Sequence, residues 1–232
     1  MNKISTLLQN LFNFFYPRLC VACQNTLFEK ETHFCLHCLQ NMPQTNYHTF
    51  EENPLNYIFM GRVPVEFVGS LLFYRKGNMV QSILQEIKYK NNKELGYYLG
   101  HLYGEQLAKT DLLTDVDLII PIPLHPKKEK LRGYNQSEMI ARGLSTGLNK
   151  EYSVKFLIRK DFTETQTKKS RINRWENVKD VFEVQNEEGI KNKHLLVCDD
   201  VLTTGATMEA ALSELVAVEG VRVSVVTLAV AG

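Results

Sequence analysis

The stretch LLVCDDVLTTGATM, residues 195–208, joins an apolar run to two adjacent acids and then to a short loop of hydroxyl residues and glycine. A short apolar run of this kind is typical of a buried strand in a parallel sheet. The apolar positions from Met208 to Leu215 recur at helical spacing. The stretch therefore predicts a strand, a loop and a helix in that order, with Asp199 and Asp200 at the end of the strand.

The composition of this loop indicates a ligand that carries both a phosphate and hydroxyl groups. In open parallel sheets ligands bind outside the carboxyl ends of the strands, and a glycine-containing loop before a helix directs N–H groups at an anion. Acids beside a phosphate would repel it unless they bind sugar hydroxyls or Mg²⁺. A ribose 5-phosphate meets both conditions, with its 2′- and 3′-hydroxyls on Asp199 and Asp200. The expected phosphate-binding residues are Thr203, Thr204, Gly205, Ala206 and Thr207.

The acid pair, Asp199 and Asp200, has two other interpretations. The acids resemble the Walker B aspartates of a nucleoside triphosphatase, but the chain contains no G-x-x-x-x-G-K-[ST] sequence, which disfavours that class. A purely structural turn before a helix cap stays open.

Strand-like and helix-like segments alternate along most of the chain, which predicts an α/β fold with a mostly parallel sheet and helices on both faces. A chain of 232 residues has room for one such domain and a small additional module. In one of the helical segments Gly96, Gly100 and Gly104 recur at every fourth position, which permits close packing against this helix. The segments of strand composition are 66–74, 115–123, 154–160, 179–184, 194–200 and 221–230.

The cysteines near the start form two C-x-x-C pairs separated by eleven residues. With no secretory signal in the sequence we expect a cytoplasmic protein, in which thiols stay reduced, so the pattern predicts a structural tetrahedral Zn²⁺ site rather than disulfides. The expected ligands are Cys20, Cys23, Cys35 and Cys38. The expected domains are an N-terminal helix and zinc ribbon at 1–45, a connector at 46–64 and the main domain at 65–232.

Residues 1–17 have apolar side chains at helical spacing but are interrupted by polar ones, and no cleavage site follows. They predict an amphipathic helix that docks on the protein's own core, with membrane or partner contact as the alternative. The segment is too short to cross a bilayer, and we expect no transmembrane segment in the chain. The formal net charge of +1 neither requires nor excludes a polyanionic partner.

The signature at 195–208 resembles the phosphoribosyl pyrophosphate (PRPP) motif of type I phosphoribosyltransferases, and the whole chain resembles the ComF family. The shared blocks, in the family's order, are YPRLCVAC with FCLHC, PIPLHPKKEKLRGYNQSEMIA, TETQTKKSRINRWENVKDVF and the signature itself. The resemblance implies a type I phosphoribosyltransferase fold with a small four-cysteine zinc module, PRPP as the ligand and Mg²⁺ as a cofactor. It also implies transfer of phosphoribosyl to an unidentified acceptor with release of Mg-pyrophosphate.

The resemblance also gives roles to two other blocks. Residues 121–136 correspond to the pyrophosphate-binding part of type I enzymes, although a solvated basic loop stays open for the lysines at 127, 128 and 130. The implied pyrophosphate-binding residues are Pro121, Ile122, Pro123, Arg132, Gly133, Asn135 and Gln136. Residues 161–179 correspond to a mobile loop that closes over the pyrophosphate, with a passive insertion as the alternative. The catalytic cations that this implies are Lys168, Lys169, Arg171 and Arg174.

One departure from purine-salvage relatives concerns the general base. Those relatives have an acid where this chain has Thr203, so a loop lysine or arginine would have to serve, or no transfer takes place. ComF proteins are associated with DNA uptake in natural transformation. The alternative function is therefore a non-catalytic or regulatory PRPP-binding factor that handles single-stranded DNA, with the DNA-uptake machinery as a partner.

Overall fold

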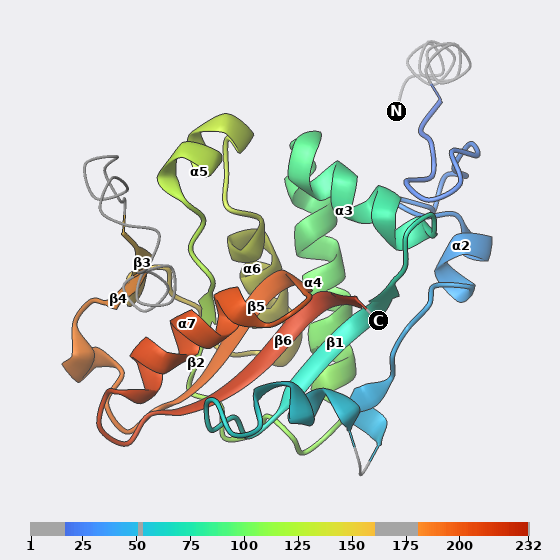
Figure 1. Ribbon diagram of the computed structural model, residues 1–232. Coiled ribbons are helices and arrows are strands. Elements are labelled where there is room, and N and C mark those ends of the chain that lie inside the picture. Colours follow the sequence, from blue (N-terminus) through green and yellow to red (C-terminus); the bar gives the residue numbers. More distant parts are fainter. Residues whose placement is uncertain (1–16, 51–52, 161–180, 232) are drawn as a thin grey trace.

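The computed structural model describes residues 17–50, 53–160 and 181–231. Its centre is a four-stranded parallel sheet with the strand order β1-β6-β5-β2 (Figure 1). The strands of this sheet are β1 (Val68–Tyr74), β2 (Leu118–Pro121), β5 (His194–Leu202) and β6 (Arg222–Ala231).

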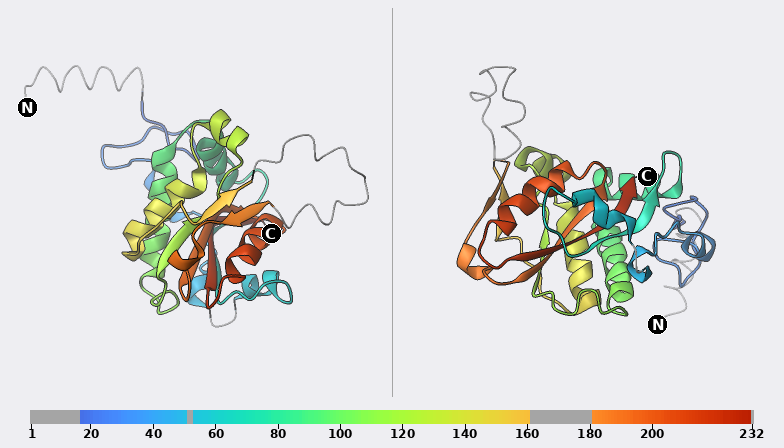
Figure 2. Two further views of the ribbon diagram at one scale, coloured as in Figure 1. Left: turned by 90° about the vertical axis from the view of Figure 1, so that its left-hand side faces the viewer. Right: turned by 60° about the horizontal axis from the view of Figure 1, so that its bottom comes forward.

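Helices cover both faces of this sheet, as the alternation of segments predicts (Figure 2). One face packs against α3 (Met79–Tyr89), α4 (Lys93–Leu107) and α6 (Gln136–Leu148), and the other against α7 (Ala206–Val216). Two short helices complete the described set, α2 (Leu36–Gln40) and α5 (Pro126–Arg132), with the 3-10 turns η1 (Tyr47–Thr49), η2 (Pro54–Phe59) and η4 (Glu187–Gly189).

The strands are apolar on both sides because successive side chains enter two different cores. Leu196 and Cys198 of β5 pack toward α4 and α6, whereas Leu195 and Val197 pack toward α7. All four are fully buried. The continuous apolar run at 195–198 is therefore explained by burial from both sides.

Two of the expected strands do not join the parallel sheet. β3 (Leu157–Arg159) and β4 (Phe182–Val184) form a separate antiparallel pair. Burial alternates along this pair of strands. Leu157 and Phe182 are buried, whereas Ile158, which follows Leu157 in β3, is 38% exposed. One buried face is the pattern of a half-exposed antiparallel pair, so the prediction from alternation alone was wrong for these strands.

The glycines of α4 allow it to lie directly against α6, as expected from their spacing. A side-chain carbon at Gly100 would collide with the Ile140 carbonyl oxygen, and one at Gly143 with the Tyr97 carbonyl oxygen. Neither backbone oxygen can rotate away, so only glycine fits at these crossings.

We expect Gly100→Ala to lower the free energy of unfolding by about 1–3 kcal/mol, the usual cost of forcing an extra carbon into a packed core. The matched control is Gly96→Ala on the same helix, where the new carbon would lie 3.3 Å from Met139 Cβ. That change should cost clearly less than Gly100→Ala, because the contact is looser and alanine favours helix. Urea denaturation of both variants measures the difference, and equal stabilities would contradict the close-packing argument.

The cysteine-rich module (residues 17–45) packs on α4 rather than standing apart. Phe34 and His33 lie against the ring of Tyr98, with ring centroids 6.1 and 5.1 Å away. The end of the module and the segment after it are held on the sheet. The Thr45 N–H donates to the Leu71 carbonyl at 3.0 Å, and the Asn53 amide donates to the Val68 carbonyl at 2.6 Å. The expected connector at 46–64 thus contains the 3-10 turns η1 and η2.

The amphipathic helix expected at the start lies outside the described residues, apart from its last position. Within the described ranges, none of the helices has both the length and the apolar character that crossing a membrane requires.

Candidate functional site

The loop between β5 and α7 encloses a small hollow at the carboxyl end of β5. Gly205 has φ +80° and stands at the N-terminus of α7, where no side chain caps the helix. The hollow has a volume of about 70 Å³ and is lined by Asp199 and residues 201–208. We call it the loop hollow. It has room for a few water molecules or one phosphate group, and the first N–H groups of an eleven-residue helix face that region.

All five residues expected to bind phosphate line the loop hollow, namely Thr203, Thr204, Gly205, Ala206 and Thr207. The sheet differs from expectation in one respect, because β5 does not stop at the acids. Asp199 and Val201 still pair with β6, opposite Thr227 and Ala229. The acids are therefore held within a hydrogen-bonded strand, which fixes their positions more firmly than a loop would.

Asp199 is held by hydrogen bonds from two sides. Its Oδ1 accepts from the Ser137 hydroxyl at 2.6 Å and from the Asp200 N–H at 2.8 Å. Burial, followed by the charge of Asp200, raises the pKa of Asp199 to about 7. The carboxyl therefore changes its protonation state near neutral pH.

Asp200 makes an ion pair with Lys88 of α3, with 3.1 Å between Oδ2 and Nζ. The Asp200 side chain is 13% exposed and that of Lys88 is 24% exposed. Asp200 thus does not point into the packed interior, and it remains accessible from the surface. Sequence reasoning missed both Ser137 and Lys88, because each reaches the acids from a different helix.

The predicted pyrophosphate-binding residues are brought to the same end of the sheet, but in different roles. Pro121 ends β2 beside Cys198, and the Ile122 carbonyl accepts from the Asn135 amide at 3.0 Å. Asn135 also caps α6, and Gln136 is 1% exposed and accepts a hydrogen bond from Arg132 at 2.8 Å. Asn135 and Gln136 therefore shape the segment, and Arg132 is its partly exposed cation.

The backbone of this segment has two further features. Gly133 follows the last residue of α5 and has φ +79°. The peptide bond between Ile122 and Pro123 is trans, as are all peptide bonds in the described part of the chain. Whether these seven residues bind pyrophosphate stays a prediction. The four predicted catalytic cations, Lys168, Lys169, Arg171 and Arg174, lie outside the described residues.

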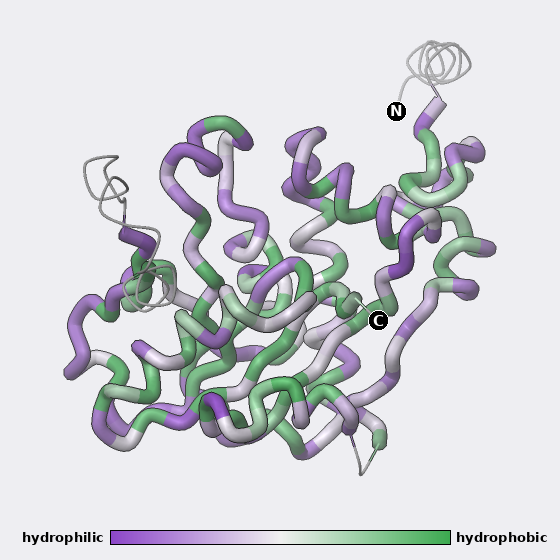
Figure 3. The backbone as a smooth tube through the Cα atoms, viewed as in Figure 1, coloured by the Kyte–Doolittle hydropathy of each residue, from purple (hydrophilic) through white to green (hydrophobic). Residues whose placement is uncertain are grey.

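Helix α5 carries the basic cluster beyond the carboxyl ends of the strands (Figure 1). None of its residues is buried, and most of them are hydrophilic (Figure 3). Arg132 at its end lies over the ring of Tyr89, 5.5 Å from the centroid, and the Tyr134 hydroxyl donates to the Ile87 carbonyl. The basic segment is thus tied to α3, the helix that supplies Lys88.

Comparison with known proteins supports a phosphoribosyltransferase-like fold for the part of the chain that carries the acid pair and the loop hollow. Residues 135–231 match the model of the phosphoribosyl transferase domain family. The DNA utilization protein YhgH of Escherichia coli O157:H7 is 28% identical over 129 residues, which are 54% of this chain and 56% of that protein. Competence protein F of Haemophilus influenzae is 24% identical over 216 residues, 87% of this chain and 90% of that protein.

These matches support a ComF-family, phosphoribosyltransferase-like protein. Its main domain has the parallel sheet and flanking helices of type I phosphoribosyltransferases. The alignment with YhgH spans only about half of that relative's length. Among solved structures, the allosteric regulatory enzyme of purine biosynthesis has a TM-score of 0.42 at 15% identity, covering 61% of this chain and 29% of that one. A hypoxanthine phosphoribosyltransferase from Staphylococcus aureus has 0.38 at 17% identity, covering 59% and 63%.

The four cysteines of the N-terminal module converge as a metal site requires. Their sulfur atoms all lie within 4.8 Å of one another, and none of the four forms a disulfide. The Sγ atoms of Cys23 and Cys35 are 3.7 Å apart, whereas sulfurs around a tetrahedral zinc with bonds of about 2.3 Å would be about 3.8 Å apart. The donor set therefore fits Zn²⁺ in the position that the sequence predicts.

Backbone N–H groups favour the thiolate form of one member of this cluster, Cys20. The Cys35 N–H lies 3.4 Å from the sulfur of Cys20. Burial alone would raise the pKa of Cys20, but the N–H groups of Cys23, Cys35 and Ala22 outweigh it and lower the pKa to about 7. A thiolate is the form that binds zinc. His33 and His37 are outside this ligand set; His33 packs on Tyr98 and the ring of His37 lies 3.4 Å from the Asn41 amide.

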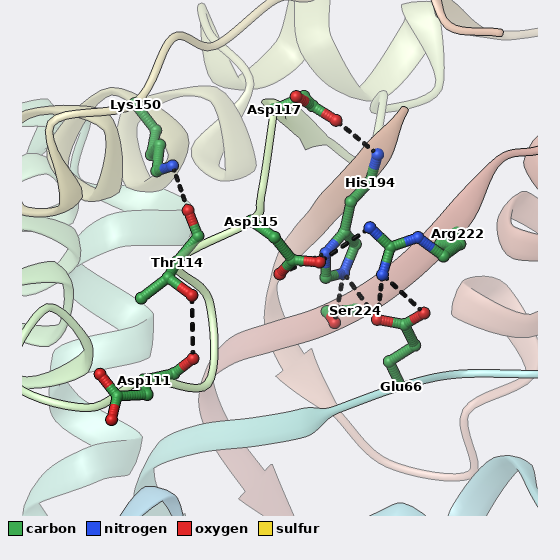
Figure 4. Close-up of polar contacts among 9 residues, drawn as sticks. All are labelled: Glu66, Asp111, Thr114, Asp115, Asp117, Lys150, His194, Arg222 and Ser224. Carbon is green, nitrogen blue, oxygen red and sulfur yellow. Dashed lines mark hydrogen bonds and ion pairs between the residues drawn. The ribbon is translucent and has the colours of Figure 1, made fainter. Parts of the chain in front are cut away.

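A second polar cluster lies at the opposite, amino-terminal end of the sheet (Figure 4). The buried His194 contacts Asp115 at 3.0 Å and Ser224 at 2.8 Å, and Arg222 donates to both Asp115 and Glu66 at 2.7 and 3.0 Å. The order Asp-His-Ser resembles a hydrolase triad, but Ser224 is fully buried in β6 and no substrate can reach it. Arg222 already pairs with both carboxylates, so the cluster is a structural network.

Proposed function

We propose that this protein binds PRPP at the end of β5 and transfers its phosphoribosyl group to a nitrogen acceptor. One observation carries this proposal: Asp199 and an uncapped helix N-terminus meet around the loop hollow, and Asp200 follows Asp199 in the same strand. The 5-phosphate would accept hydrogen bonds from the N–H groups at the start of α7 and from the hydroxyls of Thr203, Thr204 and Thr207. The ribose hydroxyls would donate to Asp199 and Asp200.

In the proposed reaction the C1–O bond to pyrophosphate breaks as the acceptor nitrogen bonds to C1. When bound, Mg²⁺ would supply positive charge that stabilises the departing pyrophosphate. The chain's own contribution is to hold the sugar by both ends, so that C1 faces the acceptor while Arg132 and the lysines of α5 lie on the pyrophosphate side. Such fixed positioning removes a large part of the entropy cost of the reaction.

The proposal is tested by two measurements on the full chain. Calorimetry with PRPP and Mg²⁺ should show binding, and ribose 5-phosphate should compete with it. Pyrophosphate release is then measured with and without a panel of nitrogen bases. Release that depends on an acceptor supports transfer, and binding without any release would favour a regulatory PRPP-binding protein. Absence of binding would rule out both.

The raised pKa of Asp199 predicts a pH dependence. The folded protein keeps this proton up to about pH 7, whereas the unfolded chain loses it near 3.8, so the stability that the proton contributes is lost as the pH rises through 7. Ligand hydroxyls need the ionised form. We expect the affinity for PRPP to fall about tenfold between pH 8 and pH 6 through this group, and binding near pH 7 to release a proton. Calorimetry in two buffers of different ionisation enthalpy measures that release.

The control for this pH effect is Asp199→Asn, which has no proton to lose. This variant should bind PRPP more weakly, and its affinity should not show the pH dependence that Asp199 causes. The remaining pH dependence should come only from titration of the ligand's own phosphate. A wild-type protein that releases no proton at pH 7 would contradict the assignment of Asp199 to the ribose hydroxyls.

A second candidate function is contact with single-stranded DNA, for which exposed α5 is the specific observation. Replacing Lys127, Lys128 and Lys130 by glutamine should lower the slope of log affinity against log salt by about two, since each phosphate contact contributes about 0.7. The control is the same change at three exposed lysines elsewhere, Lys76, Lys109 and Lys155. A wild-type slope near zero would exclude this function.

A further inference from the structure

A second, larger hollow opens between α3 and the loop after β5. Its volume is about 280 Å³, and Val201 and Thr203 line both it and the loop hollow. We call it the α3 hollow. Because the two hollows share these residues, a molecule in the α3 hollow would lie beside a sugar phosphate held in the loop hollow.

The walls of the α3 hollow suit a flat ring. Leu84 and Val201 give it apolar surface, and Tyr74 and Tyr89 give it aromatic surface. The side chain of Gln81 is held in one orientation, since its Oε1 accepts from the Gly77 N–H at 2.7 Å. Aromatic and aliphatic walls with a few oriented polar groups are typical of small-molecule sites.

The charge of the α3 hollow is unusual for a site that must remove a proton. Among the described residues that line it, Lys88 is the one charged side chain, and no carboxylate lines it. Thr203 stands at its edge with a hydroxyl, which is a poor base at neutral pH. The hollow thus offers a cation where a neutral N–H acceptor would need a proton acceptor.

We propose that the α3 hollow binds the acceptor, and that this acceptor is a planar nitrogen heterocycle that enters as an anion recognised by Lys88. The inference rests on the function proposed above. The ring nitrogen already has a free electron pair and uses it to bond to C1. At the same time the C1–O bond breaks, and the electrons of that bond leave with pyrophosphate. No proton has to move, which agrees with the lack of a carboxylate among the described residues that line the hollow.

The ion pair between Lys88 and Asp200 makes the two hollows interdependent. The Nζ and Oδ2 atoms are 3.1 Å apart, so ribose hydroxyls that donate to Asp200 compete with Lys88 for the same carboxylate. A sugar in place weakens the ion pair and leaves the lysine charge available to the α3 hollow. Anion binding there is therefore expected to be tighter when ribose 5-phosphate is already bound.

The experiment compares nicotinate with nicotinamide, two flat rings of the same size that differ in charge and have a pyridine nitrogen without a proton. Each is titrated into the full-length protein in the presence and absence of ribose 5-phosphate and Mg²⁺. Nicotinate should bind about tenfold more tightly than nicotinamide, the usual effect of one charge-assisted hydrogen bond, and more tightly with ribose 5-phosphate than without it.

Variants at one position test the role of Lys88. Lys88→Met should remove the preference for nicotinate, and Lys88→Arg should keep it. The matched control is Lys90→Met on the same helix end, because Lys90 is exposed and pairs with Glu86 at 2.7 Å. That variant should keep the preference. Binding of ribose 5-phosphate by each variant verifies that the site is folded.

The outcomes separate this inference from the proposed function. Equal binding of the two probes, or a Lys88→Met protein that keeps the preference, overturns anion recognition by Lys88. Binding of ribose 5-phosphate without binding of either probe overturns the acceptor site and leaves the proposed function intact. Failure of ribose 5-phosphate to bind overturns both.

Discussion

Replacing Asp199 and Asp200 together by asparagine is expected to abolish measurable binding of PRPP and ribose 5-phosphate. Each carboxylate would accept a hydrogen bond from a ribose hydroxyl, and a hydrogen bond to a charged group contributes about 1.5–3 kcal/mol. Loss of both should weaken binding by at least about 100-fold. Calorimetry with Mg²⁺ present measures the effect on wild type and variant side by side.

The same double variant should fold at least as well as wild type at pH 8. Burial raises the pKa of Asp199, so the ionised carboxylate destabilises the folded protein and a neutral amide removes that penalty. Loss of binding with unchanged or higher stability therefore assigns the effect to the site. Asp111→Asn, at an exposed turn near the opposite end of the sheet, is the control for a lost surface acid. Binding by the double variant within about tenfold of wild type would refute the site.

Loss of zinc is the second change with a large expected effect. Protein purified without added metal should contain about one zinc per chain, and either a strong chelator or Cys38→Ser should unfold the cysteine-rich module. Structural zinc contributes about 10–16 kcal/mol in small zinc peptides. The module has few buried apolar side chains of its own, among them Val21, Leu27 and Phe34, and these cannot replace that energy. Metal analysis and limited proteolysis around residues 17–45 measure the outcome.

Cys198→Ala is the matched control for the metal experiment. Cys198 is the fifth cysteine, fully buried in β5 and outside the cluster, so its variant should retain the zinc even if its stability falls. A Cys38→Ser protein with a full equivalent of zinc would contradict the four-cysteine site. Disulfides between the clustered cysteines would do the same.

Features that depend on local sequence could be predicted well. The loop around Gly205 was placed correctly because strand, acids, glycine and helix follow one another within the stretch 195–208. The convergence of the cysteines follows equally from their spacing. The extension of β5 to Leu202 could not be foreseen, because it depends on pairing with β6, which the residues of β5 do not specify.

Features that depend on partners far away in the sequence were missed. Ser137 lies 62 positions before Asp199, and it meets the acid only because α6 begins at the carboxyl end of the sheet. Lys88 occupies a polar position of α3 that is indistinguishable in sequence from that of Lys90, which pairs with Glu86 at the surface. The separate pairing of β3 and β4 was missed because alternation of strands and helices does not reveal which strands are neighbours.

The direct contact between α4 and α6 has a consequence for the whole molecule. The cysteine-rich module rests on Tyr98 of α4, α4 meets α6 backbone to backbone at Gly100 and Gly143, and the first turn of α6 holds Asp199 through Ser137. No flexible side chain lies between the backbones of α4 and α6 at these two glycines. The cysteine-rich module is thus mechanically connected to the helix that positions Asp199.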